Sequence, residues 1–335
     1  MAEAKAFRRL AVRWGAARLV AAICLIPVLK APAAAGDHIR LAIQKTGTVA
    51  WELAVIKAKE LDKQAGLDLD IVELASTDMG KIAISSRSAD IVVSDWLWVS
   101  RERSLGARLT LRPYSTSIGA VMVSKDSPIH GLADLAGRRI GVSGGPLDKS
   151  WLLLQAAALR AGVDLKSQAT IAYGAPPLIA EKAAEGEIDA ALEFWNFSAD
   201  LEGRGLRRAI DMLDVERSLG AIGAPVATGY VFDEDWAAKN ADALKRFFSI
   251  ADRAKKLIAT SDDAWAIVAP LTGATDVALR AIYRKIYADG IPSRDIAAEE
   301  QDARALFRIL AAAGGEALVG PAKELQPGTF WRGGE

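Results

Sequence analysis

The sequence has little of the side-chain chemistry on which most enzymes depend. Its 335 residues include one cysteine, Cys24, and two histidines, His38 and His130. His38 lies near the expected start of the mature chain, and His130 lies in a predicted surface turn. No HExxH or CxxC motif occurs, and no Ser–His–Asp set can be proposed. These absences argue against a thiol enzyme, a zinc enzyme and a histidine-dependent hydrolase. We therefore expect no catalytic residues, no metal site and no cofactor.

The chain also lacks a net charge, because 42 basic residues balance 42 acidic ones. That balance hides a basic N-terminus, since residues 1–35 hold six basic residues and one acidic residue. The remaining 36 basic and 41 acidic residues give residues 36–335 a net charge of about −5. A mildly acidic chain has no basic surface for nucleic acid or for an anionic membrane, so we expect neither as a partner.

Residues 1–35 are typical of a secretory signal. An arginine-rich start precedes an apolar run at 19–29, and residues 31–35 supply small side chains for cleavage. The apolar run is shorter than the roughly 20 residues that span a bilayer. We expect cleavage near Ala35, export to the periplasm and a mature chain without cysteine. A retained signal anchor is the alternative, and the Arg8-Arg9 pair leaves open whether export follows the general or the twin-arginine route.

Beyond residue 36, apolar strand patterns alternate with helical ones. The alternation β-α-β-α predicts two α/β units, each with a mostly parallel sheet flanked by helices. A long helical region from about 240 to 314 follows them. The predicted strands are 39–44, 67–74, 89–95 and one beginning at 109, then a long strand that begins at 118 and leads into a polar turn, 139–143, 169–173 and 189–194. The helices predicted in the first unit include 49–64 and 96–105.

Two extended passages, near 113–120 and 221–230, interrupt this alternation. They predict a chain that crosses twice between two lobes: one of residues 37–115 plus 230–335, the other of residues 120–222. Ligands of open α/β sheets bind at the carboxyl ends of the strands. If these ends face each other, they form a cleft between the lobes, and the two crossings act as its hinge.

The second unit opens with a strand, a glycine turn and a helix. Gly144, Gly145 and Pro146 follow the strand, and the helical pattern runs from Leu147 to Gly162. A helix N-terminus exposes unpaired backbone N–H groups, and glycines let a ligand approach them closely. The pattern is neither GxGxxG nor GxxxxGK[ST], so it does not indicate a nucleotide site. The alternative is a turn that serves geometry alone.

Four segments carry a resemblance to a known family: PIHGLADLAGRRIGV (128–142), SGGPLDKSWLLLQAAALRAGV (143–163), AAEGEIDAALEFW (183–195) and GYVFDEDWAAKNADALKRFF (229–248). With these segments the chain resembles the periplasmic solute-binding proteins of ATP-driven (ABC) importers, in particular the sulfonate, nitrate and thiamine-precursor group. The resemblance implies a type II two-lobe binding-protein fold, capture of a small organic solute and delivery to an inner-membrane permease with its ATPase. We further expect a monomer.

Most of the candidate ligand-binding residues lie just beyond the carboxyl end of a predicted strand. Trp96 and Trp195 follow strands of different lobes and are expected to face each other across the cleft, where they could sandwich a flat or cationic ligand. Packing in the core is the alternative for each. The full set is Gln44, Thr46, Ser94, Asp95, Trp96, Gly144, Gly145, Ser150, Glu193, Trp195, Asn196 and Tyr230, the last on the returning passage.

Three acidic residues near these positions bear on the ligand. Asp95, Asp148 and Glu193 would disfavour a purely anionic sulfonate, because like charges that lose water together cost several kcal/mol. A zwitterion, a cation or a neutral aromatic or heterocyclic compound fits as well. For Asp148 the alternative is a charge that stabilises the N-terminus of a helix. Two other functions stay open: a calcium or lanthanide site built from these carboxylates, and a sensor that presents its ligand to a receptor.

Overall fold

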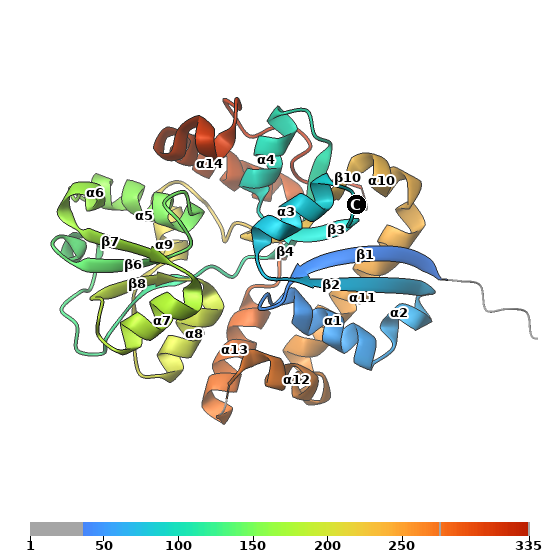
Figure 1. Cartoon of the computed structure of the whole chain (residues 1–335), viewed down its shortest axis with the longest axis horizontal. Coiled ribbons are helices and arrows are strands. Elements are labelled where there is room, and N and C mark those ends of the chain that lie inside the picture. Colours follow the sequence, from blue (N-terminus) through green and yellow to red (C-terminus); the bar gives the residue numbers. More distant parts are fainter. Residues whose placement is uncertain (1–35, 275, 334–335) are drawn as a thin grey trace, which may run out of the picture. The chain divides into compact units, whose positions relative to one another are not determined.

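The computed structural model describes residues 36–274 and 276–333, and the predicted signal segment lies outside them. Two five-stranded sheets organise the described chain (Figure 1). The two-lobe α/β fold that the sequence predicts is confirmed, and each lobe is built on one of these sheets.

The first sheet has the strand order β2-β1-β3-β10-β4. β1 runs parallel to β2 and β3, whereas β10 runs antiparallel to β3 and β4. The strands are β1 (Asp37–Gln44), β2 (Leu67–Leu74), β3 (Ile91–Ser94), β4 (Leu109–Ser115) and β10 (Thr228–Asp233).

The second sheet repeats this plan in the order β7-β6-β8-β5-β9. β6 is parallel to β7 and β8, and β5 is antiparallel to β8 and β9. Both sheets are mixed, but in each of them four of the five strands run in the same direction, as expected for mostly parallel sheets. The exceptions are β5 and β10, which each enter their sheet from the other lobe and run against its βα series. The strands are β5 (Ala120–Val123), β6 (Arg139–Ser143), β7 (Thr170–Gly174), β8 (Ala190–Glu193) and β9 (Arg207–Asp211).

Helices cover both faces of each sheet. In the first lobe, α1 and α2 lie on one side of the sheet, and α3 and α4 lie on the other (Figure 1). The helices before residue 220 are α1 (Val49–Ala58), α2 (Leu61–Gln64), α3 (Thr77–Ser85), α4 (Trp96–Ser104), α5 (Lys149–Arg160), α6 (Leu165–Gln168), α7 (Pro176–Ala184), α8 (Trp195–Gly203) and α9 (Met212–Ser218), with a 3₁₀ turn at Leu132–Leu135. The later ones are α10 (Glu234–Lys239), α11 (Ala241–Thr260), α12 (Asp262–Val268), α13 (Val277–Asp289) and α14 (Ile296–Val319), with a 3₁₀ turn at Ala269–Thr272.

Side chains that alternate between the two faces of the first sheet divide the core of the first lobe into two layers. In β1, Leu41 and Ile43 pack with α1 and α11, while Ala42 packs on the opposite face with residues of α3 and α4. Successive strand side chains point to opposite faces, so one strand serves two layers. This layering explains why strands such as ADIVVSD read as continuous apolar runs.

Three local predictions differ from the structure. The helix expected at 49–64 breaks after α1, where Glu60 takes a left-handed φ of 52°. The long extended stretch from 118 yields only the four residues of β5 as strand. β9 and α9 were not predicted, because the half-buried, arginine-bearing edge strand RRAID has no apolar run to mark it.

Helix α14 packs against both α4 of the first lobe and α5 of the second. The late helices were expected to return to the first lobe alone, so this helix departs from the prediction. Two short connections also join the sheets: residues 116–119 between β4 and β5, and residues 219–227 between α9 and β10. Among the described residues, no single helix is long and apolar enough to span a membrane, and the pair of segments that would reach that length together is bent by 106°.

Candidate functional site

The carboxyl ends of β6 and β8 place two unsatisfied polar side chains side by side. Val142 pairs with Leu192 in parallel register, so Ser143 and Glu193 follow at neighbouring positions. Glu193 is only 2% exposed. Neither of its carboxyl oxygens, nor the Ser143 hydroxyl, has a hydrogen-bond partner among the described residues. Buried polar groups are almost always hydrogen-bonded, so this unsatisfied pair is the strongest candidate for contact with a ligand.

Burial sets the protonation of Glu193. Loss of water raises the pKa of its carboxyl group to about 8. The Ser143 hydroxyl and the Phe194 N–H lower that pKa by smaller amounts, although Ser143 lacks hydrogen-bond geometry. No charged side chain contributes to the shift of this pKa. Glu193 is therefore largely neutral at pH 7 in the unliganded protein.

The glycine turn lies beside this pair. Gly144 adopts a φ of +99°, the left-handed region that favours glycine, and its N–H donates to the Gly174 carbonyl at 2.9 Å. Gly145 has no positive φ, and a Cβ placed there would meet no atom within 4 Å. The two glycines thus differ: Gly144 is required by the backbone, whereas Gly145 leaves open space beside the helix N-terminus.

Two aspartates near the predicted site, Asp95 of the candidate set and Asp148, cap helices. Asp148 accepts a hydrogen bond from the Trp151 N–H at 3.0 Å, at the start of α5. Asp95 accepts from Leu97 N and Trp98 N at 2.9 and 3.0 Å, at the start of α4. Burial raises the pKa of Asp148 to about 6, the charge of Asp95 adds to the rise, and the Trp151 N–H and Lys149 oppose it. The capping alternative for Asp148 therefore holds.

Trp96 does not present an open aromatic wall. Its side chain is 1% exposed and belongs to the core that includes α4 and α14. The Lys149 ammonium of α5 lies 5.6 Å from the centre of its ring and donates to the Ala227 carbonyl at 3.2 Å. Trp96 and Lys149 thus form a cation–π contact between the two lobes.

Trp195 lies in a different aromatic cluster. It is 8% exposed and packs edge-to-face on Trp51 and Tyr283, with ring centres 5.7 and 6.1 Å away. Trp96 and Trp195 belong to separate clusters of the core, so the expected sandwich of the two indoles is not formed. The physical reason is that each indole already packs against partners from both lobes.

The Tyr230 hydroxyl forms a hydrogen bond inside the first lobe. It donates to the Glu52 carboxylate, which also accepts from Tyr287 at 2.6 Å and from the buried Lys255 ammonium. Burial lowers the pKa of Lys255 and raises that of Tyr230 well above its usual value. Tyr230 is therefore part of an internal ionic network, which corrects the expectation that it faces a ligand.

The remaining candidates lie at strand or helix ends as expected, and their role in binding stays a prediction. Sequence reasoning missed Ser143, although its place as the last polar residue of an apolar strand was a usable signal. It also missed Glu52, a carboxylate inside an apolar helix face. The remaining candidates are Gln44 at the end of β1, Thr46 in the exposed loop that follows, the buried Ser94 at the end of β3, and Ser150 and Asn196 in the first turns of α5 and α8.

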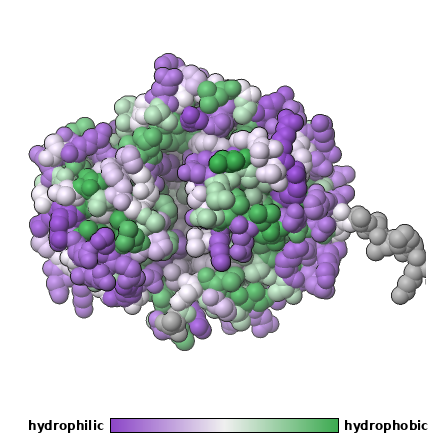
Figure 2. All heavy atoms as spheres, viewed as in Figure 1, coloured by the Kyte–Doolittle hydropathy of each residue, from purple (hydrophilic) through white to green (hydrophobic). Residues whose placement is uncertain are grey.

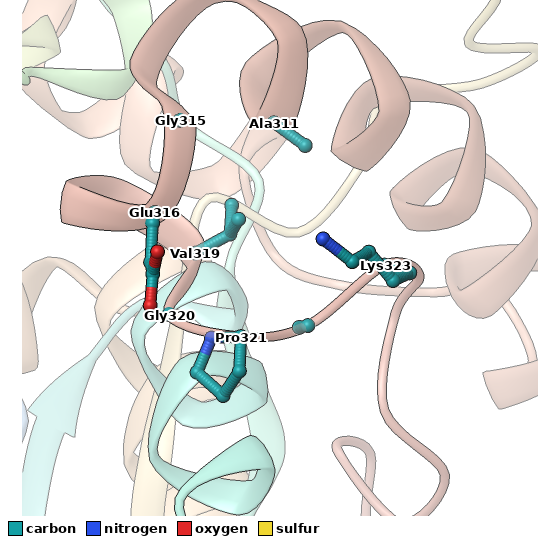
Figure 3. A pocket seen from close by; sticks show the side chains of 8 residues that line it. Ala311, Gly315, Glu316, Val319, Gly320, Pro321 and Lys323 are labelled. Carbon is teal, nitrogen blue, oxygen red and sulfur yellow. The ribbon is translucent and has the colours of Figure 1, made fainter.

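Two surface features were compared with this site. The surface is hollowed between the part of the chain that carries the first sheet and the part that carries the second (Figure 2). A separate cavity of about 400 Å³ lies at the C-terminal end of α14, with Glu316 and Lys323 on opposite sides (Figure 3). That cavity is lined otherwise by small and apolar residues and includes no strand end.

Across residues 36–274 and 276–333, no three His, Cys, Asp or Glu residues are grouped to hold a metal ion, so the carboxylates do not form a coordination sphere here.

Solved structures share this fold at low sequence identity. The aliphatic sulphonate binding protein SsuA of Escherichia coli is 20% identical, with a TM-score of 0.70 over 88% of this chain and 92% of the other. SsuA of Xanthomonas axonopodis pv. citri, bound to MOPS, is 19% identical, with a TM-score of 0.66 over 89% and 99%. The desulfurization enzyme DSZB is 17% identical, with a TM-score of 0.56 over 83% and 92%. The fold thus occurs in binding proteins and in an enzyme.

No curated protein sequence matches the chain. A family model described as NMT1/THI5 like matches residues 53–264, which is more than half of the chain and includes the glycine turn, Ser143 and Glu193. On this match, together with the two-lobe fold, the chain belongs to the NMT1/THI5-like family.

Proposed function

We propose that the protein is the periplasmic solute-binding component of an ABC importer. One observation carries the proposal: the unsatisfied Ser143–Glu193 pair lies at the carboxyl ends of adjacent strands, beside the N-terminus of α5, in a two-lobe binding-protein fold. Ligands of open α/β sheets bind at this edge. A small organic solute there would supply the hydrogen bonds that the chain itself leaves unmade.

Binding closes the two lobes in this proposal. Only two short connections, 116–119 and 219–227, join the sheets, and a few such residues can absorb a hinge motion. A solute that touches both lobes stabilises the closed state by its greater affinity for that state. The proposed lobes keep the predicted boundaries, residues 37–115 plus 230–335 and residues 120–222.

The proposed partners are a small-molecule ligand and an inner-membrane permease with its ATPase. The protein acts as a monomer in the periplasm after cleavage near Ala35. The fold shared with periplasmic sulphonate-binding proteins supports this role, and so does the family match. Capture without chemistry is proposed, because the described site offers carboxyl, hydroxyl and backbone groups and no histidine or cysteine. A role as a sensor of the same solute uses the same site and differs only in the receiving partner.

The experiment begins with the protein purified from a periplasmic fraction. Denaturation should release a small solute, which mass spectrometry identifies. Adding that solute back at 100 times its Kd should raise the free energy of unfolding by roughly 2.7 kcal/mol. Cells that lack the protein should also fail to accumulate the labelled solute. Normal uptake in such cells would contradict the transport role, and a solute altered by incubation with the protein would contradict binding without chemistry.

A further inference from the structure

We infer that the solute is an organic cation whose protonated nitrogen binds between the Glu193 carboxyl oxygens and the Ser143 hydroxyl. This inference rests on the proposed function and goes further, because it assigns the chemical class of the ligand. It excludes sulfonates, although the solved relatives compared above include binding proteins for sulfonates.

Acceptor capacity is the first argument. In its ionised form, which a bound cation favours, Glu193 offers two oxygens that only accept hydrogen bonds, and neither of them has a partner. The Ser143 hydroxyl oxygen beside them is also free to accept. An ammonium or amidinium group brings several N–H donors in a compact geometry, so one such group can satisfy all three oxygens.

The absence of a cation from the chain itself is the second argument. The strands packed against Glu193 are β5, which has no charged side chain, and β6, whose Arg139 lies at the opposite end and pairs with Asp189. Arg204, directly after α8, pairs with Glu181, and Arg208 of β9 pairs with Glu202 and Asp211. A buried carboxylate without a partner is costly, and a cationic ligand removes that cost.

The charges at the N-terminus of α5 also disfavour an anion. Asp95 and Asp148 lie near each other, since the charge of Asp95 raises the pKa of Asp148. The Lys149 ammonium is engaged with the Ala227 carbonyl and the Trp96 ring. A sulfonate at this helix N-terminus would meet two carboxyl groups, and the Lys149 ammonium there already has partners.

Apolar side chains at the same strand ends define the rest of the ligand. Leu178, in the first turn of α7, and Phe194, which precedes α8, are both exposed despite their size. Leu178 lies close to Gly174, the residue that pairs with Ser143 in the sheet. Exposed apolar side chains around a buried polar pair suit a cation that carries an aromatic or aliphatic body, rather than a sugar or a polyamine.

Three probes of one shape test the inference by titration calorimetry: benzamidinium, benzamide and benzoate, which carry positive, zero and negative charge. Benzenesulfonate is the fourth probe. We expect benzamidinium to bind most tightly and its affinity to rise about tenfold from pH 6 to pH 7, as Glu193 loses its proton below its pKa of about 8. Glu193→Gln should lower benzamidinium affinity at least tenfold, remove this pH dependence and leave benzamide affinity unchanged. Glu185→Gln, an exposed site on the same lobe, is the matched control.

The outcomes separate this inference from the proposed function. An anionic probe that binds as tightly as benzamidinium would overturn the inference. So would a Glu193→Gln protein that binds benzamidinium as tightly as the unaltered protein does. The solute that copurifies gives an independent answer: a cation supports the inference, and a sulfonate or carboxylate refutes it while the solute-binding role stands. If the protein retains no solute and binds none of the probes, the proposed function fails with it.

Discussion

The buried carboxyl groups of this protein fall into two kinds, those with partners inside the chain and those without. Glu52 accepts hydrogen bonds from two tyrosines and a lysine. Glu193 has no such partner, and burial raises its pKa to about 8. The first kind holds the first lobe together, and the second kind is the one that we propose binds a ligand. The difference lies in the neighbours of each residue and not in the residue type.

Stability should fall as pH rises from about 5 to about 8. Burial raises the pKa of Asp148 to about 6, of Glu216 to about 7 and of Glu193 to about 8, so the folded state binds more protons than the unfolded state in this range. The stabilisation from these groups is present below the unfolded pKa and is lost as pH passes each folded pKa. Urea unfolding at several pH values measures it. Glu193→Gln should flatten the upper part of the decline, and a steeper decline in this variant would contradict the assignment.

Glu52→Gln should destabilise the protein by about 3 kcal/mol, because removing one partner of a buried pair leaves the Lys255 charge uncompensated. Urea unfolding gives the value. The double variant with Lys255→Met should recover part of the loss. Glu60→Gln serves as the control, since Glu60 forms an exposed pair with Lys63 and should change stability by less than about 1 kcal/mol. An equal loss in both single variants would show that the network adds nothing.

The positions of the candidate residues at strand ends could be predicted from the sequence, but the partners of their side chains could not. Glu193 and Asp95 were found because polar side chains that end apolar strands stand out. Tyr230 was misplaced because its partner Glu52 lies 178 residues away, and no local pattern reports such a contact. The same limit applies to Trp195, whose neighbours Trp51 and Tyr283 come from distant segments.

In the glycine turn before α5, Gly144 is required by its positive φ, and Gly145 leaves open space where a side chain would lie. Gly144→Ala should cost about 1–2 kcal/mol of stability, because a side chain is strained at its positive φ. Gly145→Val should leave stability nearly unchanged and weaken solute binding, because its side chain fills the space beside the helix N-terminus. Thermal unfolding and calorimetry with the copurified solute separate the two effects. Unchanged binding in Gly145→Val would place the ligand elsewhere.

Helix α14 fastens the second connection between the lobes. Asp302 accepts from Ile222 N and Gly223 N at 2.8 and 3.0 Å and from the Arg294 guanidinium at 2.6 Å. Glu299, also buried, accepts from Val226 N at 2.8 Å. These bonds place carboxylates of one helix on the backbone of residues 219–227. The connection is therefore bound to α14 at Ile222, Gly223 and Val226.

Asp302→Ala should destabilise the protein by about 3 kcal/mol, because two backbone donors and one guanidinium lose their acceptor. Hydrogen exchange should speed up at the Ile222 and Gly223 amides more than at those of β6. Glu316→Ala, at an exposed position of the same helix, is the control and should change stability by no more than about 0.5 kcal/mol. Unchanged exchange at both amides would refute the fastening role.

Elements with strong periodicity could be predicted, and weakly patterned ones could not. The strands at 39–44 and 67–74 and the helix starting at 96 match β1, β2 and α4, because alternation or a helical apolar face marks each one. β9 is a half-buried edge strand with two arginines, which leaves no alternation to detect. The antiparallel course of β5 and β10 was missed because strand direction depends on the path between lobes, and sequence pattern does not report it.

On the scale of the whole molecule, two sheets are joined by two short connections, 116–119 and 219–227. The Ser143–Glu193 pair lies at the carboxyl ends of two strands in the second sheet. The contacts between the lobes include the Lys149–Trp96 pair and the cluster of Trp51 and Trp195. These contacts form in one arrangement of the lobes. A solute that adds further contacts between the two lobes would favour the closed state.

Small-angle scattering with the solute recovered from the purified protein tests this claim most directly. The radius of gyration is measured for the protein stripped of solute and again at saturation, with saturation checked by calorimetry. The account predicts a smaller radius of gyration at saturation and recovery of the solute unchanged. A radius of gyration that stays the same while the solute is fully bound would contradict closure of the lobes around a ligand.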